Sequence, residues 1–456
     1  MCINQESSLR MMDSKSRYLF YYVHRHLAFR EAELSALMGM FGIEWNVRHD
    51  SKARDALRNS PFCVVDYASI EDVRKVASRS VLLRNCCMLW AEAETYEELY
   101  GKLRLQVNSY KRLIRWKEPF KFNVESFGKK LNMEYKQNRF QELAFLSVEG
   151  EVDLNFPTNQ FFLFEHYGMN LGKPTDQPIK LYFGHLVVEG QSKVPWRYDL
   201  KTRIFIGNTS MDPFLSFLMA NIAQVSPGDF VYDPFVGTGS ILLSCAHFGA
   251  YCAGAEIDYN VAHGRGRPSR SHMMCRLPEE SVRRNFEQYN LLSRYVGIIV
   301  ADSSVLTFQP KLRFDSIVTD PPYGLREKVT CIGERKQRNK LVIHAGPHFP
   351  SKIKYDLLSI LLDLLNFAAT YLKIGGRLVY WFPVGLSNCK TSIYPQHPCL
   401  LQTSCCLQSL SGIHGRVLLA MVKVREPEFS VDKAYIHQDK HDFREVVLAG
   451  KPKSAA

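Results

Sequence analysis

The segment Leu312-Arg-Phe-Asp-Ser-Ile-Val-Thr-Asp-Pro-Pro-Tyr323 joins a short apolar run to an acid, two prolines and a tyrosine. Residues 314–319 are rich in β-branched and aromatic side chains, which predicts a buried strand. Neither proline can donate a backbone hydrogen bond, so the strand has to pass into a stiff, extended turn. We expect this turn at the carboxyl end of a parallel strand, where open α/β sheets bind ligands.

The turn residues Asp320, Pro321, Pro322 and Tyr323 suit methyl transfer to the exocyclic amine of a nucleobase. That amine is a weak nucleophile because its lone pair is delocalised into the ring. The Asp320 carboxylate and the Pro321 carbonyl can accept its two N–H groups and so direct the lone pair at an electrophilic methyl. The ring of Tyr323 can stack on a base flipped out of its helix. Alone, the four residues favour an ordinary strand-ending turn with a surface tyrosine.

A second motif, Asp229-Phe-Val-Tyr-Asp-Pro-Phe-Val-Gly-Thr-Gly-Ser240, predicts a strand, a glycine turn and the start of a helix. Glycines allow backbone N–H groups and a helix N-terminus to approach a ligand closely. A dinucleotide oxidoreductase would carry a third glycine three residues after Gly239, where this chain has Leu242. Together with the acidic turn, the motif resembles the S-adenosylmethionine-dependent amino-methyltransferases of nucleic acids. The resemblance implies cofactor contacts from Asp233, Pro234, Phe235, Gly237, Thr238 and Gly239.

Two further strands are expected to end in acidic residues. Residues 251–257 lead to Glu256-Ile257-Asp258, about 20 residues after the glycine turn, where a ribose-binding acid is expected. Of these, Glu256 is the preferred ribose ligand. Residues 296–301 lead to Asp302-Ser303, which we expect at the adenine edge. Such acids also serve as helix N-caps, but their occurrence after three successive strands favours a cofactor site.

The composition is that of a globular protein with about three domains. Its 456 residues are 46% hydrophobic, and the net charge of +12 is compatible with a polyanionic partner. The twelve cysteines form no C-x-x-C pair, so their spacing does not predict a zinc site. We expect reduced thiols in an intracellular protein. The apolar run 357–372 is interrupted by Asp363, Asn366 and Thr370, which predicts an amphipathic helix rather than a membrane span. We therefore expect a soluble, cytoplasmic or nuclear protein.

Several segments resemble the THUMP-domain tRNA (guanine-10-N2)-methyltransferase family, catalytic subunit. They are Arg79–Arg84, Leu181–Gly184, Arg203–Asp212, Asp233–Ser240, Asn285–Leu291 and Asp320–Arg326. The resemblance implies N2-methylation of a guanosine in tRNA, with S-adenosyl-L-methionine as cofactor. It also implies a heterodimer with a small zinc-binding activator subunit that covers an apolar part of the catalytic domain.

The implied fold class is α/β, with a C-terminal Rossmann-like seven-stranded methyltransferase domain preceded by an N-terminal α/β and THUMP RNA-binding region. We expect an N-terminal α/β subdomain at 1–60, a THUMP-like domain at 61–190 and a linker at 191–211. The methyltransferase domain is expected at 212–430 and a peripheral tail at 431–456. Asp212 and Pro213 predict a helix start, and Thr209-Ser210 before it could close over the cofactor. A glycine turn is expected at 375–376, before a central strand over 377–382.

Other functions share these motifs. DNA adenine or cytosine amino-methyltransferases and rRNA guanine-N2-methyltransferases are alternatives, as is a non-catalytic tRNA-binding subunit. Little sequence follows the catalytic core, so recognition must come from residues 1–190, which favours tRNA. The role of the basic stretch 264–270 stays open, and the basic loop 326–340 is expected to contact phosphate near the target base.

Overall fold

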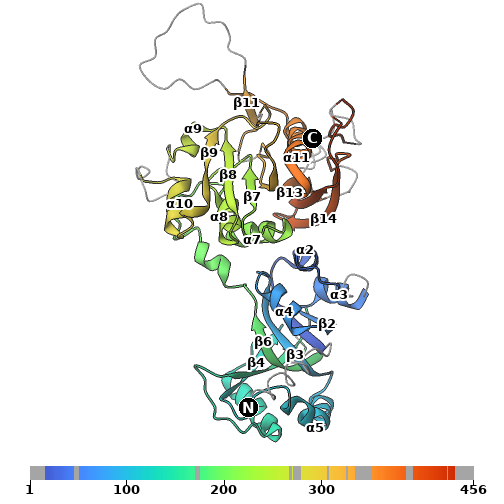
Figure 1. Cartoon of the computed structure of the whole chain (residues 1–456). Coiled ribbons are helices and arrows are strands. Elements are labelled where there is room, and N and C mark those ends of the chain that lie inside the picture. The colour runs from blue at the N-terminus through green and yellow to red at the C-terminus, as the bar shows by residue number, and fades with distance from the viewer. Residues whose placement is uncertain are drawn as a thin grey trace, which may run out of the picture. The chain divides into compact units, whose positions relative to one another are not determined.

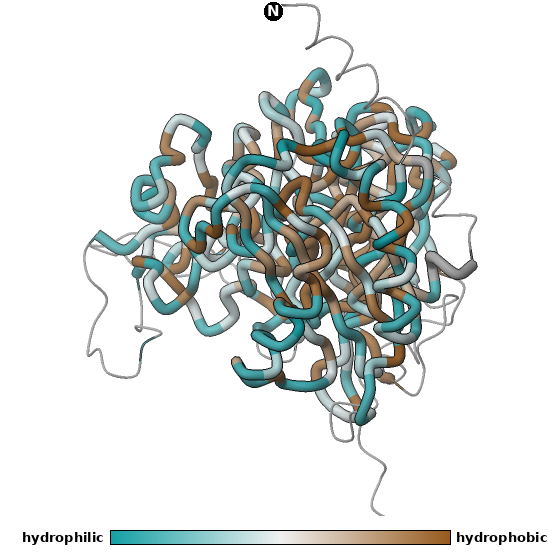
Figure 2. Tube along the Cα trace, turned by 90° about the horizontal axis from the view of Figure 1, so that it is seen from below, coloured by the Kyte–Doolittle hydropathy of each residue, from teal (hydrophilic) through white to brown (hydrophobic). Residues whose placement is uncertain are grey.

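The computed structural model describes residues 16–45, 51–169, 175–265, 270, 279–305, 308–324, 327–333, 352–386, 394–428 and 430–436. The chain forms two compact units, Met1–Lys193 and Val194–Ala456 (Figure 1). Hydrophobic residues run through the inner segments of the trace, whereas many outer turns are hydrophilic (Figure 2). No helix in the described part of the chain is both long and apolar enough to cross a membrane.

The N-terminal unit is built on one six-stranded sheet with the order β2-β1-β3-β6-β5-β4. Its strands are β1 (Ser16–Tyr22), β2 (Phe62–Ala68), β3 (Leu83–Ala93), β4 (Phe120–Phe127), β5 (Asn159–His166) and β6 (Lys180–Glu189). Only β4 and β5 are parallel. β1 pairs with both β2 and β3. Residues on the two sides of the boundary expected at residue 60 therefore belong to a single sheet.

Three helices of this unit, α4, α5 and α6, begin at side-chain caps that the sequence supplies. Ser69, Thr95 and Asn132 each accept a hydrogen bond from the backbone N–H three residues on, which satisfies a donor in the first helical turn. The helical segments are η1 (Leu27–Phe29), α2 (Arg30–Phe41), α3 (Ser51–Asn59), α4 (Ile70–Ala77), α5 (Tyr96–Lys111), α6 (Met133–Glu142) and η3 (Leu143–Leu146). Buried Glu33 on α2 accepts hydrogen bonds from Ser80 and Val81, which anchors α2 to the turn before β3.

The C-terminal unit contains a seven-stranded sheet with the order β14-β15-β13-β10-β7-β8-β9. The strands are β7 (Phe230–Asp233), β8 (Tyr251–Glu256), β9 (Tyr295–Val300), β10 (Phe314–Thr319), β13 (Leu372–Gly385), β14 (Leu400–Ser409) and β15 (His414–Lys423). β15 runs antiparallel to both of its neighbours, and the ladders from β13 to β9 are parallel. A two-stranded sheet, β11 (Thr330–Ile332) with β12 (Lys352–Lys354), completes the unit. The expected Rossmann-like seven-stranded fold is confirmed.

The glycine turn expected at residues 375–376 is wrong, because both glycines lie inside β13. The register between β10 and β13 shifts from Phe314–Leu372 to Ser316–Arg377, so the intervening residues form an irregularity in the strand. Gly375 has a φ of 81°, which allows this local departure from extended geometry.

The helical segments of this unit are η4 (Val194–Tyr198), α7 (Pro213–Ile222), α8 (Ser240–His247), α9 (Tyr259–Ala262), α10 (Val282–Gln288), η5 (Leu292–Arg294) and α11 (Leu357–Tyr371). Of these, α7, α8, α10 and α11 bury apolar residues. Asp212 caps α7 and Pro213 is its first residue, as predicted. Five leucines of α11 are buried in the cluster that includes Phe314 and Leu378, namely Leu357, Leu358, Leu361, Leu364 and Leu365. Leu362 is partly buried against the same cluster.

Residues 194–211, which the sequence suggested as part of a linker, are packed within the C-terminal unit. The hydroxyl of Tyr198 lies 2.9 Å from Nδ1 of His247 at the end of α8. Arg203 is buried and donates to the Ser240 hydroxyl and to the Tyr198 carbonyl, at 2.6 and 2.8 Å. The boundary between the two units therefore falls at Lys193–Val194.

Candidate active site

The two sequence motifs meet at the ends of neighbouring parallel strands. β7 ends at Asp233 and β10 ends at Thr319, one residue before Asp320. β7 and β10 pair directly in the sheet, although β8 and β9 come between them in the sequence. Such a reversal of strand order leaves a crevice beyond the carboxyl ends, which is where α/β sheets bind ligands. The glycine turn and the acidic turn thus face one crevice.

The glycine turn follows β7 directly and has the conformation that its glycines permit. Gly237 and Gly239 have positive φ angles of 52° and 78°. A Cβ on Gly239 would lie 2.5 Å from a methyl of Val282, so only glycine fits between this turn and α10. α8 begins at Ser240 without a side-chain cap. Its first N–H groups are therefore available to a ligand at the turn.

Asp233 has a buried carboxylate with one oxygen unsatisfied. Its Oδ1 accepts from the backbone N–H of Phe235 at 2.9 Å and from the hydroxyl of Thr319. Its Oδ2 has no partner among the described residues. Burial raises the pKa of Asp233 to about 7, and the nearby Asp320 and Glu256 act in the same direction. A cationic ligand group would satisfy Oδ2 and restore the ionised form, which is what the ammonium group of S-adenosylmethionine would supply.

Glu256 and Asp258 occupy different positions after β8. Glu256 accepts from the N–H groups of Gly237 and Asp258, at 3.0 and 2.8 Å, so it bridges the β8 end to the glycine turn. Burial raises the pKa of Glu256. Asp258 instead caps α9 and forms a 2.6 Å ion pair with Lys352. Its contacts are those of a helix cap, and half-buried Ile257 lies between the two acids.

Asp302 uses both carboxylate oxygens within the chain. Its Oδ1 accepts from the N–H and the hydroxyl of Ser304, at 2.9 and 2.7 Å, and its Oδ2 accepts from the N–H of Ile332 at 2.6 Å. The buried carboxylate therefore holds the turn after β9 and fastens β11 to it. This bonding favours a positioning role for Asp302.

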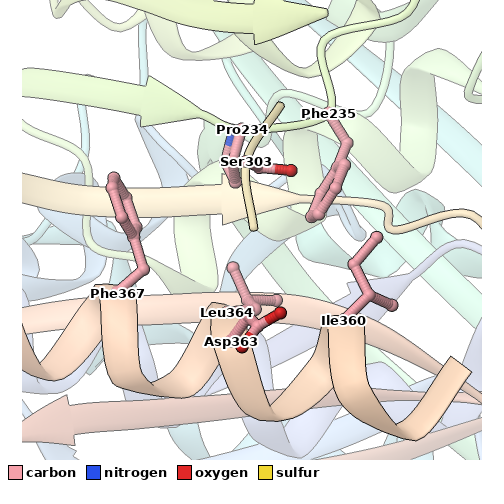
Figure 3. Close-up of a pocket in the computed structure, with 7 residues that line it drawn as sticks. All are labelled: Pro234, Phe235, Ser303, Ile360, Asp363, Leu364 and Phe367. Carbon is pink, nitrogen blue, oxygen red and sulfur yellow. The ribbon is translucent and has the colours of Figure 1, made fainter. Parts of the chain in front are cut away.

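The neighbouring Ser303 lines a small pocket (Figure 3). Pro234 and Phe235 of the glycine turn form one side, and residues of α11 form the other: Ile360, Asp363, Leu364 and Phe367. Asp363 is the acidic residue of this lining, and it accepts a 2.7 Å hydrogen bond from Tyr355. In the sequence, the interruption of an apolar run was the only signal for Asp363.

The segment before α7 lies over the glycine turn. The hydroxyl of Ser210 lies 2.6 Å from that of Thr238 and accepts from the N–H of Gly207 at 2.8 Å. The hydroxyl of Thr209 donates to Glu327 at 3.1 Å, just beyond the acidic turn. Residues 207–210 thus contact the glycine turn and a residue just beyond the acidic turn, whereas the sequence suggested only closure over the cofactor.

The acidic turn holds its carboxylate between two donors. The hydroxyl of Tyr323 donates to Oδ1 of Asp320, and Nη1 of Arg416 lies 3.3 Å from Oδ2. Burial raises the pKa of Asp320, while Arg416 and Tyr323 oppose this rise. Sequence reasoning missed Arg416, because it lies on β15 and only the fold brings it to the turn.

Only parts of the two basic segments, 264–270 and 326–340, are among the described residues. Arg270 donates to the carbonyls of Leu200 and Arg203, which ties the stretch 264–270 to the segment beside the glycine turn. Residues 266–269 of that stretch lie outside the described residues. So do residue 326 and residues 334–340 of the basic loop, and the expected phosphate contact of this loop stays a prediction.

The sheet order, the glycine turn and the acidic turn define a Rossmann-like methyltransferase. Residues 16–192 match the Tmrp11 THUMP N-terminal domain, and residues 201–341 match the RMKL-like methyltransferase domain. Over 97% of each protein, the chain is 37% identical to tRNA (guanine(10)-N(2))-methyltransferase TRMT11 of Homo sapiens. It is 36% identical to the protein of that name from Xenopus laevis, over 96% of this chain and 93% of that one. The crystal structure of TrmN from Thermus thermophilus aligns with a TM-score of 0.43 and 16% identity, over 90% of this chain and 100% of that chain. The chain belongs to the TRMT11 family of tRNA (guanine(10)-N(2))-methyltransferases.

Proposed function

We propose that this protein transfers a methyl group from S-adenosyl-L-methionine to the exocyclic N2 amine of guanosine 10 in tRNA. The proposal is supported by the adjacency of Asp233 and Asp320 at the ends of the paired strands β7 and β10. We assign the cofactor's cationic group to Asp233 and the target amine to Asp320. We infer the substrate from the names of the relatives, and the methyl-transfer chemistry from the residues around this crevice.

In this site the bound cofactor supplies an electrophilic methyl on a sulfonium. Asp233 holds the ammonium end through its unsatisfied oxygen, and the α8 N-terminus receives the carboxylate end. Glu256 lies at the end of β8, in reach of the ribose hydroxyls. Asp320 and the Pro321 carbonyl accept the two N–H groups of the guanine amine, so that the nitrogen lone pair faces the methyl. Tyr323 offers its ring to the flipped base.

The cofactor proposal extends to the other residues around the crevice. Phe235 and Ser303 border the small pocket beside the glycine turn, and we assign the adenine of the cofactor to this part of the crevice. Ser210 and Thr209 close the cofactor side from above the glycine turn. The remaining members of the proposed cofactor site are Pro234, Gly237, Thr238, Gly239 and Ile257, and those of the catalytic turn are Asp320, Pro321, Pro322 and Tyr323. Asp258 and Asp302 belong to the proposed site as residues that hold its turns, through the cap of α9 and the bonds to Ser304 and Ile332.

We assign tRNA binding to the N-terminal unit. Residues 16–192 match a THUMP domain, and no other large recognition region accompanies the catalytic unit in the described chain. Phosphate contacts from such a unit carry little sequence information, so it would fix the distance between its grip on the tRNA and the target base.

A small zinc-binding activator subunit is part of the proposal. β9 is an edge strand, with an outer side that no described strand pairs. Val296, Ile299 and Val300 on it are 58, 44 and 45% exposed. An exposed apolar edge strand promotes aggregation unless a partner covers it. We place the activator on this edge, and we place the complex in the cytoplasm, where twelve cysteines without a disulfide pattern would stay reduced.

Mass spectrometry of nucleosides in tRNA tests the function. tRNA from cells lacking the protein should lose N2-methylguanosine at position 10, and the wild-type chain should restore it. Asp320→Ala should not restore it, whereas Asp315→Ala, on the same strand, serves as a control. Unchanged N2-methylguanosine in the deleted cells would refute the proposal.

A further inference from the structure

Arg416 lies against the acid of the catalytic turn, although 96 residues separate it from Asp320. Its side chain is 12% exposed, and that of Asp320 is 23% exposed. The contact is a single one, from Nη1 to Oδ2 at 3.3 Å. A guanidinium that served only to neutralise a carboxylate would gain most from two parallel hydrogen bonds. The remaining N–H groups of Arg416 therefore face something other than Asp320.

The orientation of the guanidinium is fixed by three neighbours. Its central carbon lies 4.0 Å from the ring centroid of Trp381. Its Nε donates to Oε1 of Gln408 at 2.8 Å. Its Nη2 lies 3.6 Å from the sulfur of Met211, and a thioether is a weak acceptor. Arg416 also interacts with the hydroxyl of Tyr323 and opposes the rise in the pKa of Tyr323 that burial causes. Arg416 is thus held rigidly beside the catalytic turn, and the Met211 sulfur is the weak acceptor among its contacts.

The pair of Arg416 and Asp320 matches one edge of guanine. That edge carries an amine, an N1–H and the O6 carbonyl in a row, which are donor, donor and acceptor. The carboxylate can accept from the amine, while a guanidinium nitrogen about 3 Å away can donate to a carbonyl further along the same edge. Adenine and cytosine place a ring-nitrogen acceptor next to their amines. Neither presents this order, so the pair would discriminate against both.

We propose that Arg416 is a specificity-determining residue that donates a hydrogen bond to O6 of the target guanine. The proposal rests on the proposed function, because it requires that Asp320 holds the guanine amine. Arg416 then selects guanine by its carbonyl, as arginine does when it reads guanine in other nucleic-acid complexes. Binding the flipped base would replace the weak contact with Met211 by a charge-assisted hydrogen bond.

A tRNA with 6-thioguanosine at the target position tests this inference. The substitution keeps the amine and N1–H and replaces O6 by sulfur, which is a poor acceptor. With the full chain and its activator, kcat/KM for guanosine should exceed that for 6-thioguanosine by about tenfold or more. In Arg416→Met the ratio should fall close to one. Arg416→Lys, which keeps a charge without the planar fork, should give an intermediate ratio.

The matched control is Arg425→Met, which removes an arginine paired with Asp432 on the same unit and should keep the wild-type ratio. If Arg416→Met slows both substrates equally, Arg416 only positions Asp320 and the inference is overturned. Failure of Arg416→Met to bind S-adenosylhomocysteine would show that this variant is misfolded, and Arg416→Lys then replaces it in the test. A ratio of kcat/KM for guanosine to that for 6-thioguanosine that is the same in Arg416→Lys as in the wild type would then overturn the inference. Failure of the proposed function would look different, because the wild-type protein would then methylate neither tRNA.

Discussion

The hydroxyl of Thr319 donates a hydrogen bond to Oδ1 of Asp233, which joins the last residue of β10 to the last residue of β7. The bond is fully buried and connects positions 86 residues apart. It leaves Oδ2 of Asp233 as the oxygen without a partner in the described chain. The strand that carries the catalytic turn therefore also orients the acid proposed to hold the cofactor.

Replacing Thr319 by valine should weaken cofactor binding. The side chain keeps its shape but loses the donor, so the Asp233 carboxylate would lose a hydrogen bond and its fixed orientation. We expect an approximately tenfold higher dissociation constant for S-adenosylhomocysteine, as for the loss of a hydrogen bond to a charged group. Thr319→Ser retains the hydroxyl and should bind nearly as the wild type does. Equal affinities of the valine and wild-type proteins in calorimetry would contradict this role.

Cofactor affinity should depend on pH through Asp233. Burial raises the pKa of this carboxyl from 3.8 to about 7. A protonated Asp233 offers no charge to an ammonium group, so affinity for S-adenosylhomocysteine should fall as the pH decreases through 7. Calorimetric titrations between pH 6 and pH 8 would measure this fall. Asp233→Asn should bind weakly at every pH in the range.

The same pKa gives the cofactor-free protein the opposite pH dependence. Between about pH 4 and pH 7 the folded chain holds a proton on Asp233 that the unfolded chain has released. Because the folded state binds more protons, this group makes the free energy of unfolding fall as the pH rises through that window. The raised pKa of Glu256 acts in the same direction. An Asp233→Asn protein whose unfolding shows the wild-type pH dependence would count against the buried, proton-binding carboxyl.

The sequence predicted the C-terminal fold well because its signals are local. A strand that ends in two prolines and a strand that ends in a glycine turn can each be recognised within about ten residues. The Rossmann-like sheet, the cap at Asp212 and the helix at 357–371 follow from such signals. The boundary at residue 60 could not be judged locally, since β1 joins its sheet through strands that come later in the chain.

Contacts within the site that depend on strands distant in the sequence could not be predicted from the sequence. Arg416 reaches Asp320 from an antiparallel strand near the end of the chain, and nothing in the residues around it marks it. Asp258 was grouped with Glu256 by spacing, whereas the structure shows it capping α9. A carboxylate after a strand has both uses, and only its actual donors distinguish them.

Asp320→Ala should abolish most turnover with little change in cofactor affinity. The carboxylate touches Tyr323 and Arg416 in the free protein and would contact the target amine, not the cofactor. We expect kcat to fall roughly 100- to 1000-fold, as for other preorganised polar groups at a reacting centre. Single-turnover methylation and S-adenosylhomocysteine binding should be measured on the same preparation. A severe loss of cofactor binding would show that Asp320 acts elsewhere.

Tyr323 has two separable contributions. Its hydroxyl bonds to Asp320, a contact that the stacking hypothesis did not include. Tyr323→Phe should therefore lower kcat about tenfold, because Asp320 loses a donor while the ring remains. Tyr323→Ala should cost about a further tenfold, since stacking on a base is also lost. Equal losses in the two variants would leave the ring without a role.

The last prediction concerns where the catalytic unit begins. A fragment of residues 205–456 would contain the whole seven-stranded sheet, the glycine turn and the acidic strand ends. In the structure Tyr198 packs against Phe217 and Tyr289, and Arg203 donates to the first residue of α8, so these contacts would be missing from that fragment.

A fragment of residues 194–456 should therefore bind S-adenosylhomocysteine with nearly the affinity of the full chain, whereas 205–456 should bind more weakly and unfold at a lower temperature. Even the longer fragment lacks the unit assigned to tRNA. With the activator present, it should keep the cofactor and lose methylation of full-length tRNA, because Asp320, Tyr323 and Arg416 read one base and not its place in the tRNA. Near-full methylation of the same single guanosine by residues 194–456 would show that the catalytic unit selects its target alone.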